Sequence, residues 1–120
     1  MTISGEPAAA RGPHTIQVGW SAHLKPSAPF LFTNHSCDPN SGIKADGIGR
    51  PGLYARRAIT AGEEITWDYA MSESEFAAIA CSCGAKNCRG VVEKGWGGLS
   101  AERREAYREW VMPYLRAATK

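Results

Sequence analysis

The four cysteines of the chain form two groups that lie far apart in the sequence. One cysteine stands alone, and the other three follow the pattern C-x-C-x4-C, so no thiol is left over. Structural zinc takes four tetrahedral ligands, and thiolates are common donors. The pattern predicts one structural zinc ion that joins two distant segments, held by Cys37, Cys81, Cys83 and Cys88. Four reduced cysteines without metal, or a pair of disulfides, are the alternatives.

Length and composition are those of one ordinary domain. The chain has 120 residues, 43% of them hydrophobic, and a formal net charge of +2. A charge this small does not indicate binding to nucleic acid or to a membrane surface, so neither partner is expected. The N-terminus has no apolar signal segment, and no stretch has transmembrane length. We therefore expect a soluble intracellular, cytoplasmic protein, where clustered cysteines more often bind metal than form disulfides.

The residue pattern favours short strands with little helix until the end of the chain. Residues 1–13 are rich in Gly, Pro and Ala and predict a flexible tail. Alternating polar and apolar residues indicate strands. The predicted strands cover residues 14–19, 53–59 and 65–69. Ser100 is placed to cap a helix over residues 101–112, which Pro113 should kink or end.

Three motifs give the chain a family resemblance. Residues 34–40 read NHSCDPN, residues 62–69 read GEEITWDY and residues 81–90 read CSCGAKNCRG. In this order they resemble the NHSCxPN, GEELTxDY and post-SET CxCxxxxCxG motifs of SET-domain protein lysine methyltransferases. The resemblance covers about residues 30 to 90. No clear GxG segment precedes Asn34, so the chain resembles a short form of the domain.

The resemblance implies a fold that is mostly β with minor α content. SET-like (β-clip) domains have several small sheets around a knot-like crossing, in which the first two motifs thread together. The expected parts are a flexible tail (1–13), a truncated SET-like domain (14–79), a post-SET zinc loop (80–98) and a C-terminal helix packed on the same domain (99–120).

The resemblance also implies methyl transfer from S-adenosylmethionine to a protein lysine side chain. Asn34 and His35 match the pair that contacts the cofactor, largely at its adenine end. Val92, or its neighbour Val91, follows the last cysteine, where the family has an apolar residue against the adenine. Tyr69 matches the catalytic tyrosine whose hydroxyl aligns the target amine. The implied partner is a lysine-containing protein or peptide, and a homodimer is left open.

Each role has a plainer alternative. Asn34 could simply cap a turn, and a strand tyrosine such as Tyr69 could pack in the core with its hydroxyl bonded. The whole chain could be a SET-derived zinc-binding interaction module with weak or no catalysis. We interpret Tyr54 and Trp67 as core residues, and Gly47-Ile48-Gly49 as a hairpin turn and not a cofactor loop.

Acidic residues gather between Thr60 and Ala80, where no basic residue occurs. They are Glu63, Glu64, Asp68, Glu73 and Glu75. Next to Tyr69 they would form an acidic surface that attracts a lysine-rich peptide. An ordinary solvated face explains the same residues equally well.

Overall fold

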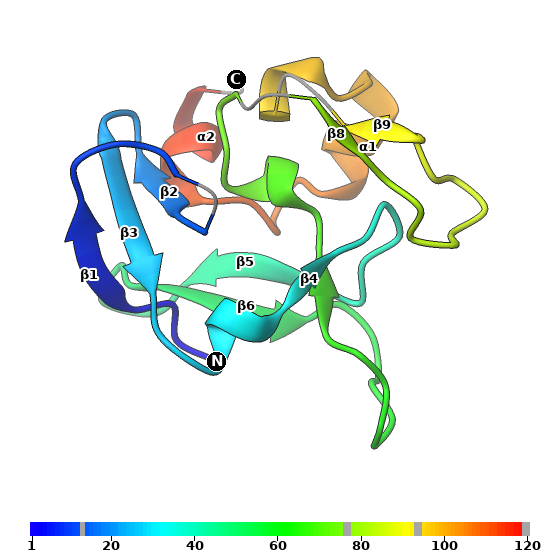
Figure 1. The fold of residues 1–120 in the computed structure, drawn as a ribbon, viewed down its shortest axis with the longest axis horizontal. Helices are drawn as coiled ribbons and strands as arrows, with labels where there is room; N and C mark the ends of the chain where they lie inside the picture. The colour runs from blue at the N-terminus through cyan, green and yellow to red at the C-terminus, as the bar shows by residue number, and fades with distance from the viewer. Residues whose placement is uncertain (13, 76–77, 93–94, 119–120) are drawn as a thin grey trace.

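Within residues 1–12, 14–75, 78–92 and 95–118, which the computed structural model describes, the strands form four small sheets (Figure 1). The first sheet is antiparallel, with strand order β1-β3-β2. Its strands are β1 (Gly5–Ala8), β2 (Ile16–Gly19) and β3 (Ala22–Pro26). Strand β2 lies inside the predicted strand over residues 14–19. Strand β3 was not predicted, and it ends at Pro26.

The N-terminal residues belong to the fold, so the prediction of a flexible tail over residues 1–13 is wrong for residues 1–8. Strand β1 pairs with β3 along its whole length. The Ile3 side chain is buried in the core, and its N–H donates to the Pro51 carbonyl at 3.0 Å. The composition, rich in Gly and Pro, suggested that the backbone N–H and C=O groups of this segment would face solvent. They pair with those of β3 instead.

The other sheets have two strands each. These strands are β4 (Asn34–His35), β5 (Ser41–Ala45), β6 (Pro51–Ala55), β7 (Thr66–Trp67), β8 (Ile79–Ala80) and β9 (Val91–Val92). Strands β5 and β6 form an antiparallel hairpin, and β8 pairs with β9 in the same way. Strand β4 instead pairs in parallel with β7, which joins the first two motifs. Strand β6 starts and ends earlier than the predicted strand over residues 53–59, and β7 is shorter than the strand predicted over 65–69.

The β5–β6 turn confirms the interpretation of Gly47-Ile48-Gly49 as a hairpin turn. The Asp46 carboxylate accepts from the N–H groups of Ile48 and Arg50, both at 2.9 Å. Gly49 has φ = +85°, a conformation that glycine adopts without steric cost.

Helical structure is confined to short segments in the described part of the chain. The 3₁₀ turns are η1 (Phe30–Phe32), η2 (Tyr69–Met71) and η3 (Gly95–Gly98), and the α-helices are α1 (Ala101–Ala106) and α2 (Pro113–Ala118). Ser100 caps α1 as predicted, because its hydroxyl accepts from the Arg103 N–H at 3.1 Å. The prediction of one C-terminal helix is wrong: α1 ends at Ala106, and Pro113 begins α2, where a proline gives up no hydrogen bond. None of these helices is long and apolar enough to cross a membrane.

The core draws side chains from the whole chain. Its most completely buried members are Ile16, Ile43, Met71, Met112 and Leu115. These residues come from β2, β5, η2, α2 and the residue before α2, so the C-terminal segment packs in the same core as the strands. The predicted fold class, small β sheets with little helix, is therefore confirmed.

Two aromatic residues, Trp67 and Tyr54, test the core predictions. Trp67 is buried, as predicted. Tyr54 is 41% exposed on β6, so its assignment to the core is wrong. Phe30 is buried, but Phe32 in the same 3₁₀ turn is 73% exposed, so the segment leading to Asn34 is buried only at its start.

Candidate functional site

His35 and Tyr69, which come from two different motifs, are in direct contact. The parallel pairing sets His35 opposite Trp67 and so brings Tyr69 beside the imidazole. The Tyr69 N–H donates to Nδ1 of His35 at 3.1 Å, and the two rings lie 5.1 Å apart. Burial lowers the pKa of His35, which favours the neutral ring that this hydrogen bond requires.

Tyr69 lines a cavity of about 320 Å³. The lining is mainly apolar and includes Phe30, Leu31, Thr33, Trp67 and Ile79. Among the described residues the Tyr69 hydroxyl has no side-chain hydrogen-bond partner, and the backbone of His35 approaches it. Burial raises the pKa of Tyr69, so its hydroxyl stays protonated at neutral pH. A protonated phenol beside a cavity can both donate to a ligand and accept from it.

A row of aromatic rings fixes the position of Tyr69. The Phe30 and Trp67 rings are 5.3 Å apart, and the Trp67 and Tyr69 rings are 4.9 Å apart. The Trp67 Nε1–H donates to the Thr33 hydroxyl at 2.9 Å, which holds the indole in place. Trp67 therefore serves the core, as predicted, and also lines the cavity beside Tyr69.

Glu73 forms a polar part of the cavity wall that the sequence interpretation missed. Its Oε2 accepts from the Gln17 N–H at 2.9 Å and from the Ser72 hydroxyl at 2.5 Å. The Arg11 guanidinium lies 3.5 Å from Oε1 and also donates to the Gln17 side chain at 2.6 Å. Gln17 and Arg11 lie more than 50 positions from Glu73 in the sequence, so no local pattern could have revealed these contacts.

The predicted acidic surface next to Tyr69 is wrong for three of its members. Asp68 and Glu73 are buried, and Glu63 pairs with Arg57 at 2.8 Å. These carboxylates therefore hold the fold together and do not form a docking surface for basic peptides.

Asp68 lies fully buried next to Tyr69 in the chain and connects three parts of the structure. Its Oδ1 accepts from the Ala70 N–H at 3.0 Å and so caps η2, the turn that begins with Tyr69. Its Oδ2 accepts from Nη2 of Arg89 at 2.6 Å and from the Tyr107 hydroxyl at 2.9 Å. Arg89 follows the last cysteine, and Tyr107 follows α1, so sequence spacing gave no sign of either contact.

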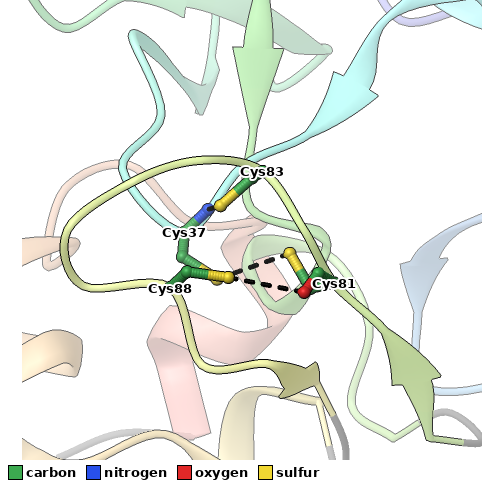
Figure 2. Close-up of side chains that lie close together, drawn as sticks. All are labelled: Cys37, Cys81, Cys83 and Cys88. Carbon is green, nitrogen blue, oxygen red and sulfur yellow. Dashed lines mark hydrogen bonds between the residues drawn. The ribbon is translucent and has the colours of Figure 1, made fainter.

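The four cysteines come together as predicted, and Figure 2 shows their side chains converging. Their sulfur atoms all lie within 4.8 Å of one another. Cys37 follows β4, and the other three lie on the loop between β8 and β9. All four are free thiols, so the structure contains neither of the alternative disulfides.

This geometry fits a zinc ion. Zn–S bonds of about 2.3 Å place tetrahedral sulfur atoms about 3.8 Å apart. The sulfurs of Cys37 and Cys81 are 3.9 Å apart. The Arg89 N–H points to the Cys37 sulfur at 3.4 Å, and the Cys37 N–H points to the Cys83 sulfur at 3.5 Å. The latter bond lowers the pKa of Cys83, which favours the thiolate that a metal requires.

The other residues assigned to the cofactor differ in their exposure. Asn34 is exposed, and its Nδ2 donates to the Glu64 carboxylate at 2.8 Å. Val92 is only 2% exposed, whereas its neighbour Val91 is 53% exposed. On strand β9, Val91 is therefore the valine with apolar surface available to a ligand.

Known proteins resemble the part of the chain that holds the His35–Tyr69 contact. The SET domain family model matches residues 9–70. The "Histone-lysine N-methyltransferase, H3 lysine-36 specific" of Yarrowia lipolytica is 45% identical over 64 residues. The histone-lysine N-methyltransferase ash1 of Drosophila melanogaster is 43% identical over 67 residues, and the histone-lysine N-methyltransferase set-2 of Caenorhabditis elegans is 48% identical over 64 residues.

These alignments cover 51% of this chain in each case. They cover only 8%, 3% and 4% of the three relatives, so the chain corresponds to a small part of each. The matched region of the family model runs from before β2 to η2 and ends one residue after Tyr69. Because that match spans more than half of the 120 residues, the chain belongs to the SET domain family.

Proposed function

We propose that the chain transfers a methyl group from S-adenosylmethionine to a lysine side chain of a protein. The observation that carries this proposal is the position of Tyr69, which contacts His35 of the first motif and lines a largely apolar cavity. The relatives are named as histone-lysine methyltransferases, which makes histone lysines the first substrates to test.

The residues around β4 suit S-adenosylmethionine. Asn34 is exposed and its side chain can exchange hydrogen bonds with an adenine edge. Phe32, two residues earlier, is 73% exposed and offers an aromatic face. We assign Asn34, His35 and the apolar surface of Val91 to the cofactor site, with Val92 packed behind its neighbour. Bound there, S-adenosylmethionine would supply a methyl group to an uncharged amine, and its sulfur would leave as a thioether.

The cavity beside Tyr69 suits the target amine. The apolar lining disfavours a charged ammonium group and so lowers the pKa of an entering lysine. The Tyr69 hydroxyl can accept from the amine N–H and fix the direction of its lone pair. Positioning of this kind supplies much of the rate in a displacement reaction. Arg11 offsets the charge of Glu73 on the cavity wall, so the wall does not trap the lysine as an ammonium ion.

The cysteine cluster has a structural part in this proposal. Cys37, Cys81, Cys83 and Cys88 would hold one zinc ion with all four positions filled by protein, as structural zinc sites do. Such an ion would hold the loop between β8 and β9 against the segment that follows His35.

The test is methyl transfer in a purified system. The zinc-loaded chain is incubated with isotopically labelled S-adenosylmethionine and core histones, and labelled lysines are located by mass spectrometry. We expect label on lysine with the wild type and a large loss with Tyr69→Phe. Cofactor binding by calorimetry without any transfer would instead favour an interaction module. The absence of cofactor binding would contradict the proposed site itself.

A further inference from the structure

Arg103 of α1 contacts both parts of the cysteine site. Its Nη1 donates to the Cys37 carbonyl at 2.5 Å, and its Nη2 donates to the Asn87 carbonyl at 3.1 Å. Asn87 lies on the loop that carries three of the cysteines, whereas Cys37 follows β4. A single guanidinium therefore bridges the loop and the segment against which the loop packs.

Tyr107, one helical turn after Arg103, makes a second contact. Its hydroxyl donates to the buried Asp68 carboxylate at 2.9 Å and accepts from Nη1 of Arg103 at 3.3 Å. Asp68 in turn caps η2 through the Ala70 N–H. The Tyr107 side chain is 3% exposed, so its contact is shielded from water. The two residues thus reach the cysteine loop and the turn of Tyr69 from one helical segment.

The orientation of this segment is fixed at both ends. The Ser100 hydroxyl caps its first turn. Arg103 and Tyr107 share one helical face because they are four residues apart. The Arg56 guanidinium lies 5.1 Å from the centre of the Tyr107 ring, on the face toward the β5–β6 hairpin. These residues all lie beyond the region matched by the SET domain model, except Arg56.

We propose that α1 is a latch, in which Arg103 and Tyr107 are positioning residues that hold the cysteine loop and the Tyr69 turn together. The consequence for methyl transfer rests on the function proposed above; the consequence for the loop does not. Without Arg103 the two carbonyls lose a charged donor, and the loop loses its link through α1 to the segment of Cys37.

The first test measures metal release. Zinc-loaded wild type, Arg103→Ala and Arg103→Lys are mixed with a chromogenic chelator, and the rate of zinc release is recorded. We expect release to be about tenfold faster in Arg103→Ala, because charged hydrogen bonds are among the stronger ones. Arg103→Lys should fall between, since one ammonium cannot repeat the two-pronged contact. The control is Arg108→Ala, which removes an exposed arginine paired only with Glu105 among the described residues.

The second test is independent of the metal. Amide hydrogen exchange is followed for the peptide over residues 81–92 in the zinc-loaded and in the chelated protein. We expect Arg103→Ala and Tyr107→Phe to speed exchange in both forms, while Arg108→Ala leaves it unchanged. For methyl transfer, the KM for S-adenosylmethionine should rise more than kcat falls.

Wild-type exchange and wild-type zinc release in Arg103→Ala would overturn the latch, whatever the activity. A wild type that binds no zinc would contradict the metal assignment, and exchange in the chelated protein would still decide the latch. Faster exchange together with an absence of methyl transfer would support the latch and refute the proposed function.

Discussion

The carboxylate of Asp68 and the guanidinium of Arg89 lie 2.6 Å apart, although the two residues are 21 positions apart in the sequence. Asp68 immediately precedes the proposed catalytic tyrosine, and Arg89 immediately follows the last cysteine of the predicted zinc site. The carboxylate is fully buried and the guanidinium is partly exposed. This ion pair therefore connects the cavity beside Tyr69 to the cysteine loop by charge as well as by packing.

Replacing Asp68 with asparagine should be costly. The Asp68→Asn variant keeps the size of the side chain but leaves Arg89 without its counter-charge and weakens the acceptor for Tyr107. Breaking a buried pair costs about 3–5 kcal/mol, and the partial exposure of Arg89 lowers our expectation to about 2–3 kcal/mol. Urea unfolding of the zinc-loaded protein measures this change in the free energy of unfolding.

The matched control is Asp46→Asn. Asp46 and Arg50 also form an ion pair, at 2.9 Å, but on the exposed β5–β6 turn. Surface pairs contribute about 0–1 kcal/mol, so this variant should stay close to wild type. Equal losses in the free energy of unfolding would show that burial does not make the Asp68 ion pair more stabilising than the exposed one.

Removing the Tyr69 hydroxyl should affect catalysis and leave the fold intact. Tyr69→Phe keeps the ring contacts with Trp67 and His35 and removes a hydroxyl that has no side-chain hydrogen bond among the described residues. The free energy of unfolding should change by less than about 1 kcal/mol. We expect kcat to fall roughly 10- to 100-fold while the affinity for S-adenosylmethionine is retained. If the hydroxyl also restrains the amine, the product should shift towards more methyl groups.

The control for this prediction is Tyr54→Phe, because Tyr54 is exposed on β6 away from the cavity lining. It should retain wild-type rate and product. A wild-type rate and product in Tyr69→Phe would refute the role assigned to its hydroxyl.

Loss of one cysteine should remove the metal and weaken the fold. Cys83→Ser replaces one of four converging sulfurs, and bound structural zinc contributes directly to folding. We expect well under one zinc per chain by elemental analysis and a Tm that no longer responds to a chelator. The control is Ser82→Ala, which changes the exposed residue between two cysteines. A wild-type chain with far less than one zinc would contradict the site.

Several features of the fold and of the site could be predicted from the sequence. The prediction that Cys37 lies beside the other three cysteines is confirmed. It could be made from the sequence because a structural zinc site requires four ligands of a particular type. The hairpin turn at residues 46–50 and the helix cap at Ser100 were also predicted correctly. Each depends on hydrogen bonds between residues that are close in the sequence. Likewise the resemblance predicted that the first two motifs would meet, and β4 and β7 do pair.

Long-range contacts could not be predicted in this way. Asp68 and Glu73 looked like surface acids because their partners, Arg89, Tyr107 and Gln17, are distant in sequence. The N-terminal strand was missed for the same reason, since β1 is stabilised by its pairing with β3 and not by its own propensity. Pro113 was interpreted as a stop signal, but the chain uses it to begin α2.

Gly95, the first residue of η3, packs against the backbone of residues 73 and 74. Replacing it should show how tightly these two segments pack. Gly95 has φ = +56°, and an added Cβ would collide with the backbone of Glu73 and Ser74. The neighbouring Trp96 N–H donates to the Glu73 carbonyl at 2.9 Å, so the backbone cannot simply move away. The left-handed conformation costs alanine about 1 kcal/mol, and overpacking adds about 1–3 kcal/mol.

We therefore expect Gly95→Ala to lower the free energy of unfolding by about 2–4 kcal/mol, as measured by urea unfolding of the zinc-loaded protein. Gly97→Ala is the matched control, because Gly97 lies in the same 3₁₀ turn and no described atom lies within 4 Å of its added Cβ. That variant should match the wild type or gain up to about 1 kcal/mol, since alanine reduces the entropy of the unfolded chain. Because Glu73 lines the cavity beside Tyr69, the strain in Gly95→Ala should also reach the site and raise the KM for the lysine substrate. Equal stability of the two variants would mean that η3 does not pack against Glu73 as described.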